Sequence, residues 1–137
     1  KGIAYANKLF ESHKQEELFL VGIALYWAEG KKTRGTISMS NSDQRIIRIF
    51  YKWAKRYVPE TRLTIRLQAP RDGNISECRK HWEDLFPDVR ISTIYIGKNT
   101  KVKYGVCNLE ILGIRGARTF IHQLMDRFSE RMDNIAS

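Results

Sequence analysis

A carboxylate and two lysines stand together where the most apolar stretch of the chain ends. Glu29 is the last residue of a helix predicted over residues 15–29, and Gly30, a good residue for ending a helix, precedes Lys31 and Lys32. A carboxylate is unfavourable at a helix C-terminus because the helix dipole is already negative there, so this position favours a cation as partner. A hard cation such as Mg²⁺ binds carboxylate and carbonyl oxygens, and an ion pair with a nearby lysine is the alternative. Glu29 is therefore a candidate metal ligand.

One carboxylate holds a catalytic metal poorly, so a second chain would have to supply another. A two-fold dimer through the helix over residues 18–29 would bring two copies of Glu29 together. This helix is apolar on nearly all sides, which is typical of burial on more than one face. Gly22, Ala24 and Ala28 allow close approach between helices, although tight packing within the chain is the alternative explanation. The pattern favours a homodimer.

Two predicted strands carry a polar face opposite an apolar one. Side chains alternate strictly over residues 62–69 and again over residues 36–40. Arginine suits guanine, glutamine suits adenine, and serine or threonine suits either base, so this face could contact base edges. An ordinary solvated sheet face is the alternative. The predicted DNA-binding residues are Lys31, Lys32, Arg34, Thr36, Ser38, Ser40, Arg62, Thr64, Arg66 and Gln68.

The charge of the chain is concentrated in one segment. The chain has 24 basic and 15 acidic residues, for a formal net charge of +9. Within residues 30–71 only Asp43 and Glu60 oppose eleven basic residues, so this segment carries the whole excess. A concentrated basic region is typical of a protein with a polyanionic partner, and a solvated basic surface is the alternative. RNA is a weaker candidate than double-stranded DNA, because the predicted strands lack interleaved surface aromatics.

Length and composition indicate a globular domain. The chain has 137 residues, of which 42% are hydrophobic and 28% are charged. The longest apolar run, residues 18–28, is too short for a membrane span, so we expect no membrane partner. Cys78 and Cys107 form no metal-binding motif and are expected to be free thiols. The chain begins with Lys1 rather than Met, which suggests a fragment or a processed chain of a cytoplasmic protein, associated with the nucleoid when bound to DNA.

Helices and strands are intermixed without a regular βαβ series. The predicted helices cover residues 3–17, 15–29, 43–57, 75–86 and 114–132, and the predicted strands cover residues 36–40, 62–69, 90–96 and 104–112. Residues 41–43 (NSD) supply an N-cap for the helix that follows. The pattern predicts an α+β fold, with a mixed or antiparallel sheet and helices packed on one face. Residues 1–17 are predicted to be an N-terminal helical extension, and residues 18–137 a single domain.

Residues 22–31 (GIALYWAEGK) resemble a divergent LAGLIDADG motif. Ala24 falls at the central glycine of that motif, and Leu25, Ala28 and Gly30 match it directly. Glu29 falls on the final acidic position, where the family binds its metal. Together with residues 41–43 (NSD) and 104–107 (YGVC), the motif is similar to a bacterial and archaeal branch of LAGLIDADG homing-endonuclease-like proteins, over roughly residues 18–130.

The resemblance implies a saddle-shaped sheet lying on double-stranded DNA, with the motif helices paired at the centre. It also implies Mg²⁺-dependent hydrolysis of a phosphodiester in each strand. Only one motif is present, so the family pattern implies a homodimer and a near-palindromic target. Lys101 and Lys103 are candidates for stabilising the transition state. Some relatives bind DNA without cutting it, so a non-catalytic DNA-binding regulator is the alternative.

This chain departs from the family pattern in three places. Tyr26 and Trp27 are bulkier than the usual residues of the motif. The hairpin over residues 31–35 is very short, which predicts a small footprint or relaxed specificity. A helix over residues 75–86 separates strands that are usually adjacent.

Overall fold

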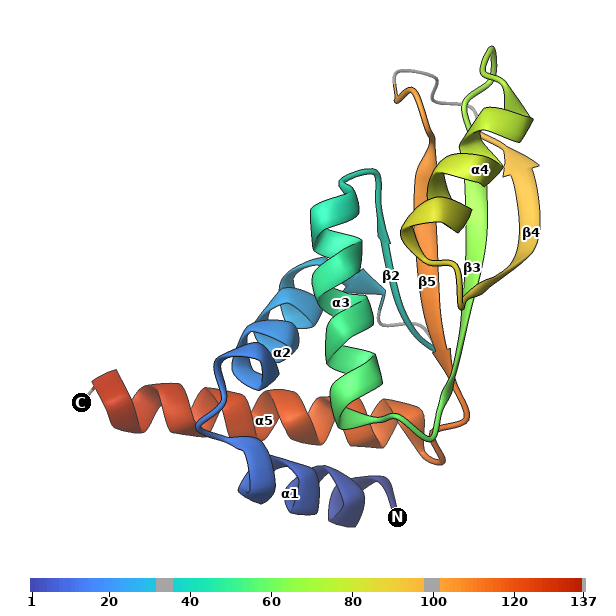
Figure 1. Ribbon diagram of the computed structural model, residues 1–137. Coiled ribbons are helices and arrows are strands. Elements are labelled where there is room, and N and C mark those ends of the chain that lie inside the picture. The colour runs from blue at the N-terminus through green and yellow to red at the C-terminus, as the bar shows by residue number, and fades with distance from the viewer. Residues whose placement is uncertain (32–35, 98–101, 137) are drawn as a thin grey trace.

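A mixed five-stranded sheet forms the centre of the molecule, and helices cover one of its faces (Figure 1). The computed structural model describes residues 1–31, 36–97 and 102–136. The helices are α1 (Gly2–His13), α2 (Glu17–Glu29), α3 (Gln44–Tyr57), α4 (Ile75–Leu85) and α5 (Ala117–Ala136). The strands are β1 (Gly30–Lys31), β2 (Ile37–Asn41), β3 (Arg62–Ala69), β4 (Arg90–Ile96) and β5 (Val106–Leu112). The predicted α+β class is confirmed.

The strands are arranged in the order β1-β2-β5-β3-β4. The central strand β5 is antiparallel to both β2 and β3, whereas β4 is parallel to β3. The helix α4 connects β3 to β4, as a parallel pair requires. Through α4 the chain returns to place β4 at the edge of the sheet, beside β3. The strands β4 and β5 are consecutive in the sequence, yet β3 lies between them in the sheet. The two-residue β1 was not predicted.

Close packing between α2 and α3 explains one of the small residues of the motif. The buried side of α2 consists of Phe19, Gly22, Ile23 and Tyr26. A Cβ at Gly22 would lie 2.0 Å from the Trp53 ring, and the Trp53 indole donates a hydrogen bond to the Phe19 carbonyl at 3.0 Å. Gly22 is thus required for packing within the chain, which leaves Ala24 and Ala28 on the other side of the helix.

The helix α2 runs directly into β1, without a left-handed turn. The helix ends at Gly30, as predicted, and Gly30 has φ −73° and ψ 154°, which is extended backbone. Glycine is needed here for space, because a Cβ would lie 2.3 Å from the Tyr26 ring. The Tyr26 hydroxyl donates to the Lys31 carbonyl. Glu29 and Lys31 are therefore held on regular elements of the fold.

The N-terminal helix shares the core of the rest of the chain. Ala6, Leu9 and Phe10 belong to the same buried cluster as the sheet and the other helices. The helix packs along α5, where the rings of Tyr5 and Phe120 stack at 5.0 Å. Figure 1 shows α1 lying alongside α5, at the bottom of the view. None of the helices in the described part of the chain is long and apolar enough to cross a membrane.

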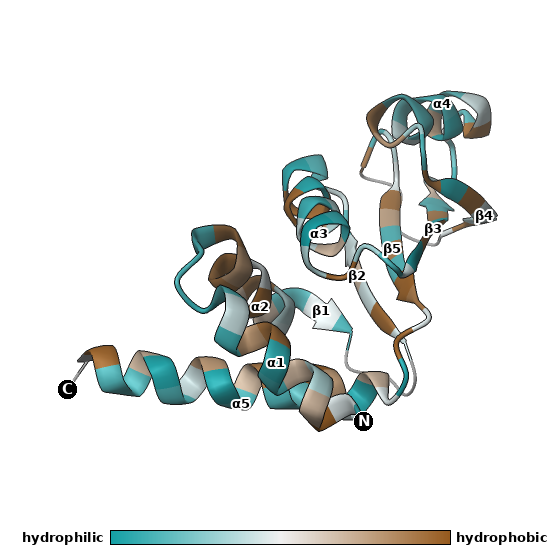
Figure 2. Cartoon of the chain, turned by 60° about the horizontal axis from the view of Figure 1, so that its bottom comes forward, coloured by the Kyte–Doolittle hydropathy of each residue, from teal (hydrophilic) through white to brown (hydrophobic). Residues whose placement is uncertain are grey.

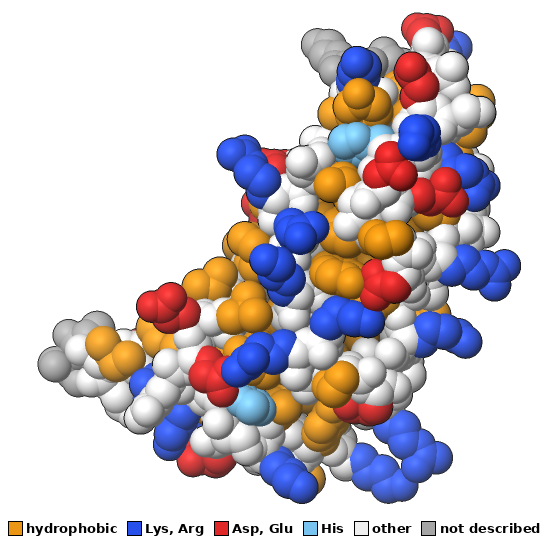
Figure 3. Space-filling view, viewed as in Figure 1, with side chains coloured by type: hydrophobic (Ala, Val, Ile, Leu, Met, Phe, Trp, Pro, Cys, Tyr) orange, Lys and Arg blue, Asp and Glu red, His pale blue; other side chains and the backbone are white. Residues whose placement is uncertain are grey.

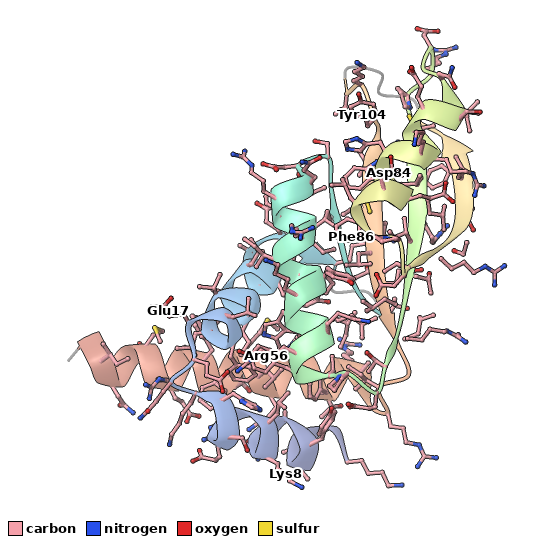
Figure 4. The ribbon with its side chains drawn as sticks, in the orientation of Figure 1. Lys8, Glu17, Arg56, Asp84, Phe86 and Tyr104 are labelled. Atoms are coloured by element: carbon pink, nitrogen blue, oxygen red, sulfur yellow. The ribbon has the colours of Figure 1, made fainter. Side chains whose placement is uncertain are left out.

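Two carboxylates hold α3 at its ends. Asp43 caps the N-terminus, as predicted, by accepting the Arg45 backbone N–H at 2.9 Å. Glu16, between α1 and α2, accepts hydrogen bonds from the Arg56 guanidinium at 3.0 Å and the Tyr57 hydroxyl at 3.0 Å (Figure 4 labels Arg56). His13 contacts the other oxygen of Glu16 at 2.5 Å. The hydrogen bonds from His13 and then Arg56 lower the pKa of Glu16 to about 2.

Replacing Glu16 by Gln is expected to destabilise the protein at neutral pH and to have a smaller effect in acid. The pKa of Glu16 is about 2 in the folded protein, against about 4.3 in an unfolded chain. Its stabilisation is therefore complete above the unfolded value and is lost as the pH falls toward the folded one. Thermal unfolding of both proteins between pH 7 and pH 2 should show Tm values that converge below about pH 4. Tyr57→Phe, which removes one donor, should give a smaller effect of the same sign. A Tm difference that stays constant over this range would contradict the assignment.

Candidate functional site

The face of the sheet turned away from the helices is built from alternate residues of all five strands. The register places one set of side chains toward the helices, including Met39, Ile65 and Leu109, and the other set on the opposite side. We call that opposite side the open sheet face. It consists of Lys31, Ser38, Ser40, Arg62, Thr64, Arg66, Gln68, Arg90, Thr93, Tyr95, Val106, Asn108, Glu110 and Leu112.

The open sheet face is basic over the part of the chain that the structure describes. Four cationic side chains lie on it, those of Lys31, Arg62, Arg66 and Arg90, against the single carboxylate of Glu110. Among the residues that the structure describes, none of the five forms an ion pair. Their charges are therefore available to a ligand. Arg90 was not among the predicted residues, because its place on this face depends on the parallel pairing of β4 with β3.

The basic segment over residues 30–71 does not form one surface. Lys31, Arg62 and Arg66 lie on the open sheet face, whereas α3 carries five cations on the helix-bearing side: Arg45, Arg48, Lys52, Lys55 and Arg56. Three of the five form ion pairs: Arg45 with Asp43, Lys55 with Asp88, and Arg56 with Glu16. Figure 3 shows the helix-bearing side, where acidic and basic side chains are interspersed. The unpaired charge of the sheet is thus separate from the mixed charge of the helices.

An aromatic ring on the outer part of the open sheet face supports one of the arginines. The Arg66 guanidinium lies 6.0 Å from the centre of the Tyr95 ring, and Tyr95 is 45% exposed. A cation over an aromatic face is held there by the ring quadrupole. Gln68 is paired with Tyr95 in the register and packs beside Gly97, where a Cβ would lie 2.1 Å from its amide nitrogen. This part of the face therefore presents Arg66 and Gln68 in defined positions.

Small polar residues fill the middle of the open sheet face and are largely buried there. Ser38 is 2% exposed and Asn108 is 7% exposed. The Ser40 hydroxyl donates to the Asn108 side-chain oxygen at 2.7 Å. Ser38 lies on the predicted face but is too buried to contact a ligand in this conformation, and the Ser40 hydroxyl is engaged with its neighbour. Thr36 precedes β2 and is half-buried.

Glu110 lies in a hollow of the open sheet face. A cavity of about 470 Å³ lies between β3, β4 and β5. Its lining comprises Arg62, Leu63, Thr64, Asp88, Arg90, Ser92, Glu110 and Leu112. Ser92 is the extra residue of a bulge in β4, and its hydroxyl donates to the Ile65 carbonyl at 3.3 Å. The cavity thus combines the arginines Arg62 and Arg90 with the carboxylates of Glu110 and Asp88, of which Asp88 forms an ion pair with Lys55. Glu110 was not predicted as a site residue, although the alternation of β5 could have placed it on this face.

Glu29 lies at the end of α2, exposed, at the edge of the sheet that β1 forms. No three Asp, Glu, His or Cys side chains come together as metal ligands within the described ranges. Mg²⁺ is usually held by one or two carboxylates together with water and substrate oxygens. Glu29 is a candidate ligand only if a second chain contributes to the same site.

The structure does not bring Lys103 to Glu29 within one chain. Lys103 precedes β5, and its ammonium lies 5.2 Å from the centre of the Tyr104 ring, beside α4 (Figure 4 labels Tyr104). Glu29 is adjacent to β1, which β2 separates from β5. Lys101, like Lys32 and Arg34, lies outside the described residues.

The outer side of α2 is apolar and open. Val21 is 49% exposed and Trp27 is 43% exposed. Val21, Ala24 and Ala28 follow one another at helical spacing on the side opposite the buried residues, and Figure 2 shows that hydrophobic residues dominate this helix. The Trp27 ring is set edge to face against Phe128 of α5 at 6.3 Å. Tyr26, the other bulky residue of the motif, is buried in the core instead.

Comparisons with protein-family models, with curated proteins and with solved structures find no significant match to this chain. The resemblance of residues 22–31 to a LAGLIDADG motif therefore stays a prediction that rests on the residues themselves.

Proposed function

We propose that this protein binds double-stranded DNA with its open sheet face. The observation that carries the proposal is a set of four cations on this face that form no ion pair among the described residues, Lys31, Arg62, Arg66 and Arg90. Phosphates neutralised by such cations release condensed counterions, which favours binding. The polar side chains between the cations suit base edges, and β-strands can enter a DNA groove. In this proposal the protein acts in the cytoplasm, associated with the nucleoid while bound.

A duplex fits this face better than single-stranded nucleic acid does. Stacking platforms for unpaired bases need several exposed aromatic rings. Tyr95 is the one aromatic side chain on the described part of the open sheet face, and Arg66 already lies over it. Most of the face therefore offers charge and hydrogen-bonding groups, which suit the backbone and groove edges of a duplex.

We further propose that two chains pair through the outer side of α2. Exposed apolar side chains that follow a helical stripe are typical of a partner interface. The small side chains of Ala24 and Ala28 leave room for a close approach of a second helix, and Gly22 already serves the contact with α3. A two-fold axis at this stripe would place the same side of each helix in contact. Each chain would then contribute one open sheet face to the duplex.

Cleavage of the duplex is the finer part of the proposal. In such a dimer two copies of Glu29 would approach each other at the ends of the paired helices, and together they would be candidate ligands for Mg²⁺, which would supply Lewis-acid chemistry at a phosphodiester. The resemblance to the LAGLIDADG motif supports this assignment. The reaction would be a site-specific double-strand cut, with Lys101 and Lys103 as remaining candidates for positively charged assistance.

A non-catalytic DNA-binding regulator is the second candidate function. The observation that favours it is the position of Lys103, which lies beside α4 and before β5, whereas Glu29 lies next to β1 at the edge of the sheet. Both candidates share the DNA contact and differ only in whether the phosphodiester is cut.

Removing cations from the open sheet face is expected to weaken duplex binding and its salt dependence together. The variant Arg62→Gln/Arg66→Gln should lower the slope of log Kd against log salt by about 1 for each phosphate that is no longer neutralised. The control Arg48→Gln/Lys52→Gln removes the same charge from α3, so it should leave the slope nearly unchanged. Fluorescence anisotropy with a labelled duplex between about 50 and 200 mM salt, a range typical for such measurements, tests this. Equal effects in both variants would place the DNA elsewhere.

A charge on the outer side of α2 is expected to separate the dimer. Ala24→Arg would place an unpaired cation in an apolar contact, which is strongly unfavourable. The control Ala4→Arg puts the same side chain on an exposed position of α1. Sedimentation velocity should show a dimer for the wild type and the control and a monomer for Ala24→Arg. A wild-type protein that stays monomeric at all concentrations and on DNA would refute the proposed pairing.

Replacing Glu29 is expected to abolish cutting and spare binding. Glu29→Gln should lower the rate of Mg²⁺-dependent nicking by more than about 100-fold. Losing a residue that only supports a metal ligand typically costs about 10–100-fold, so a larger loss indicates a ligand. Glu17→Gln changes another exposed carboxylate of the same helix and should cut normally. The assay is incubation of supercoiled plasmid libraries with and without Mg²⁺. Equal nicking by both variants would remove Glu29 from the reaction, and tight binding without nicking by any of the proteins would establish the regulator.

A further inference from the structure

The negative charge of Glu110 is unfavourable on a surface that binds a polyanion. It lies on the central strand of the sheet, paired with Ser38 of β2 and Thr64 of β3, in the middle of the open sheet face. It is the only acidic side chain that the register puts on this face within the described residues. Next to DNA phosphates such a charge lowers the affinity for every duplex, unless a hydrogen-bond donor of the ligand meets it.

Glu110 is also kept free of its neighbours. Arg62 and Arg90 line the same cavity of about 470 Å³, yet neither forms an ion pair with it. Arg62 is a diagonal neighbour of Glu110 across the β5–β3 pair, since Arg62 is paired with Leu112 and Thr64 with Glu110. Diagonal neighbours in a sheet stand about 7–8 Å apart, which allows two long side chains to reach one ligand from adjacent positions. The cavity thus presents the Glu110 carboxylate near the Arg62 guanidinium, while the second carboxylate in its lining, that of Asp88, is paired with Lys55.

The bases of a duplex differ in how they meet such a pair. Cytosine offers its N4 amino group in the major groove, and a carboxylate accepts from it. Guanine offers only the N7 and O6 acceptors there, which repel a carboxylate and suit an arginine. Adenine also offers an amino donor, N6, but its N7 acceptor lies beside that donor and repels a carboxylate, and thymine has no donor, so both suit Glu110 less well than cytosine does. A C·G pair is the one that offers a donor on one base for Glu110 and two acceptors together on the other base for a bidentate contact with Arg62.

We propose that Glu110 is a specificity-determining residue that selects a cytosine, with Arg62 contacting the guanine paired to it. This inference rests on the proposed duplex contact by the open sheet face. Glu110 then weakens binding to most sequences and strengthens discrimination at one base pair. Its effect is a difference between sequences, achieved in part by repulsion of the wrong ones.

Selection from a randomised duplex library, followed by Kd measurements on the selected sequence and its single-base variants, tests the proposal. The wild type should require a C·G pair at one position and bind about 10-fold or more weakly when that pair is changed. Glu110→Ala should bind unrelated duplexes more tightly and discriminate less at this position. Glu110→Gln should shift its preference there toward adenine, because an amide both donates to N7 and accepts from N6.

Glu83→Gln is the matched control. It removes one exposed carboxylate from α4, on the helix-bearing side, and should leave every base preference unchanged. Thermal unfolding of each variant checks that the sheet is intact. If Glu110→Ala and Glu110→Gln bind duplexes with the wild-type salt dependence and select the same bases, the role of Glu110 is refuted while DNA binding stands. If the wild type binds no duplex in a salt-dependent way, both proposals fail.

Discussion

The pairing of β5 with β2 on one side and β3 on the other is the constraint on which the rest of the structure depends. Because side chains alternate along a strand, this register decides at once which residues reach the core and which face outward. A slip of one residue would bury Arg66 and Glu110 and expose Ile65 and Leu109. The apolar side binds α3 and the rest of the helical layer, and the same alternation gathers charges from distant parts of the sequence on the open sheet face.

The helix α2 fits into this arrangement by using its two sides differently. Its inner side is shaped by Gly22, which lets Trp53 lie against the backbone, and by Tyr26, whose hydroxyl anchors β1. Its outer side keeps Val21 and Trp27 exposed. A helix that is hydrophobic all round is expected to be buried all round. The chain buries one side only, and this imbalance is the main physical reason to expect a second copy.

Periodicity in the sequence predicted most elements to within a few residues and both sides of β3. The same periodicity could not give the partner of β4, because parallel pairing across α4 depends on contacts that are distant in sequence. Arg90 and Tyr95 were missed on the candidate site for that reason.

Ser38 was placed on the correct side of β2, but its burial depends on its neighbours in the folded sheet. The charge excess over residues 30–71 was real, yet α3 carries half of it to the other side of the molecule, since helices and strands in one segment face different layers.

The open sheet face and the outer side of α2 are thermodynamically linked in the proposed assembly. In this proposal the described part of one chain offers four cations to a duplex, so their electrostatic contribution to binding is modest at physiological salt. Two chains that stay paired on one duplex double the number of cations that reach it. DNA that binds the dimer better than the monomer must therefore strengthen the α2 contact by the same factor. In the proposed assembly the dimer is therefore expected to be more stable on DNA than in solution. In that assembly the carboxylates of Glu29 and Glu110 differ in whether they need the second chain. Glu29 needs its counterpart from the second chain, whereas Glu110 lies in a cavity formed by a single chain and can act on each half of the target separately.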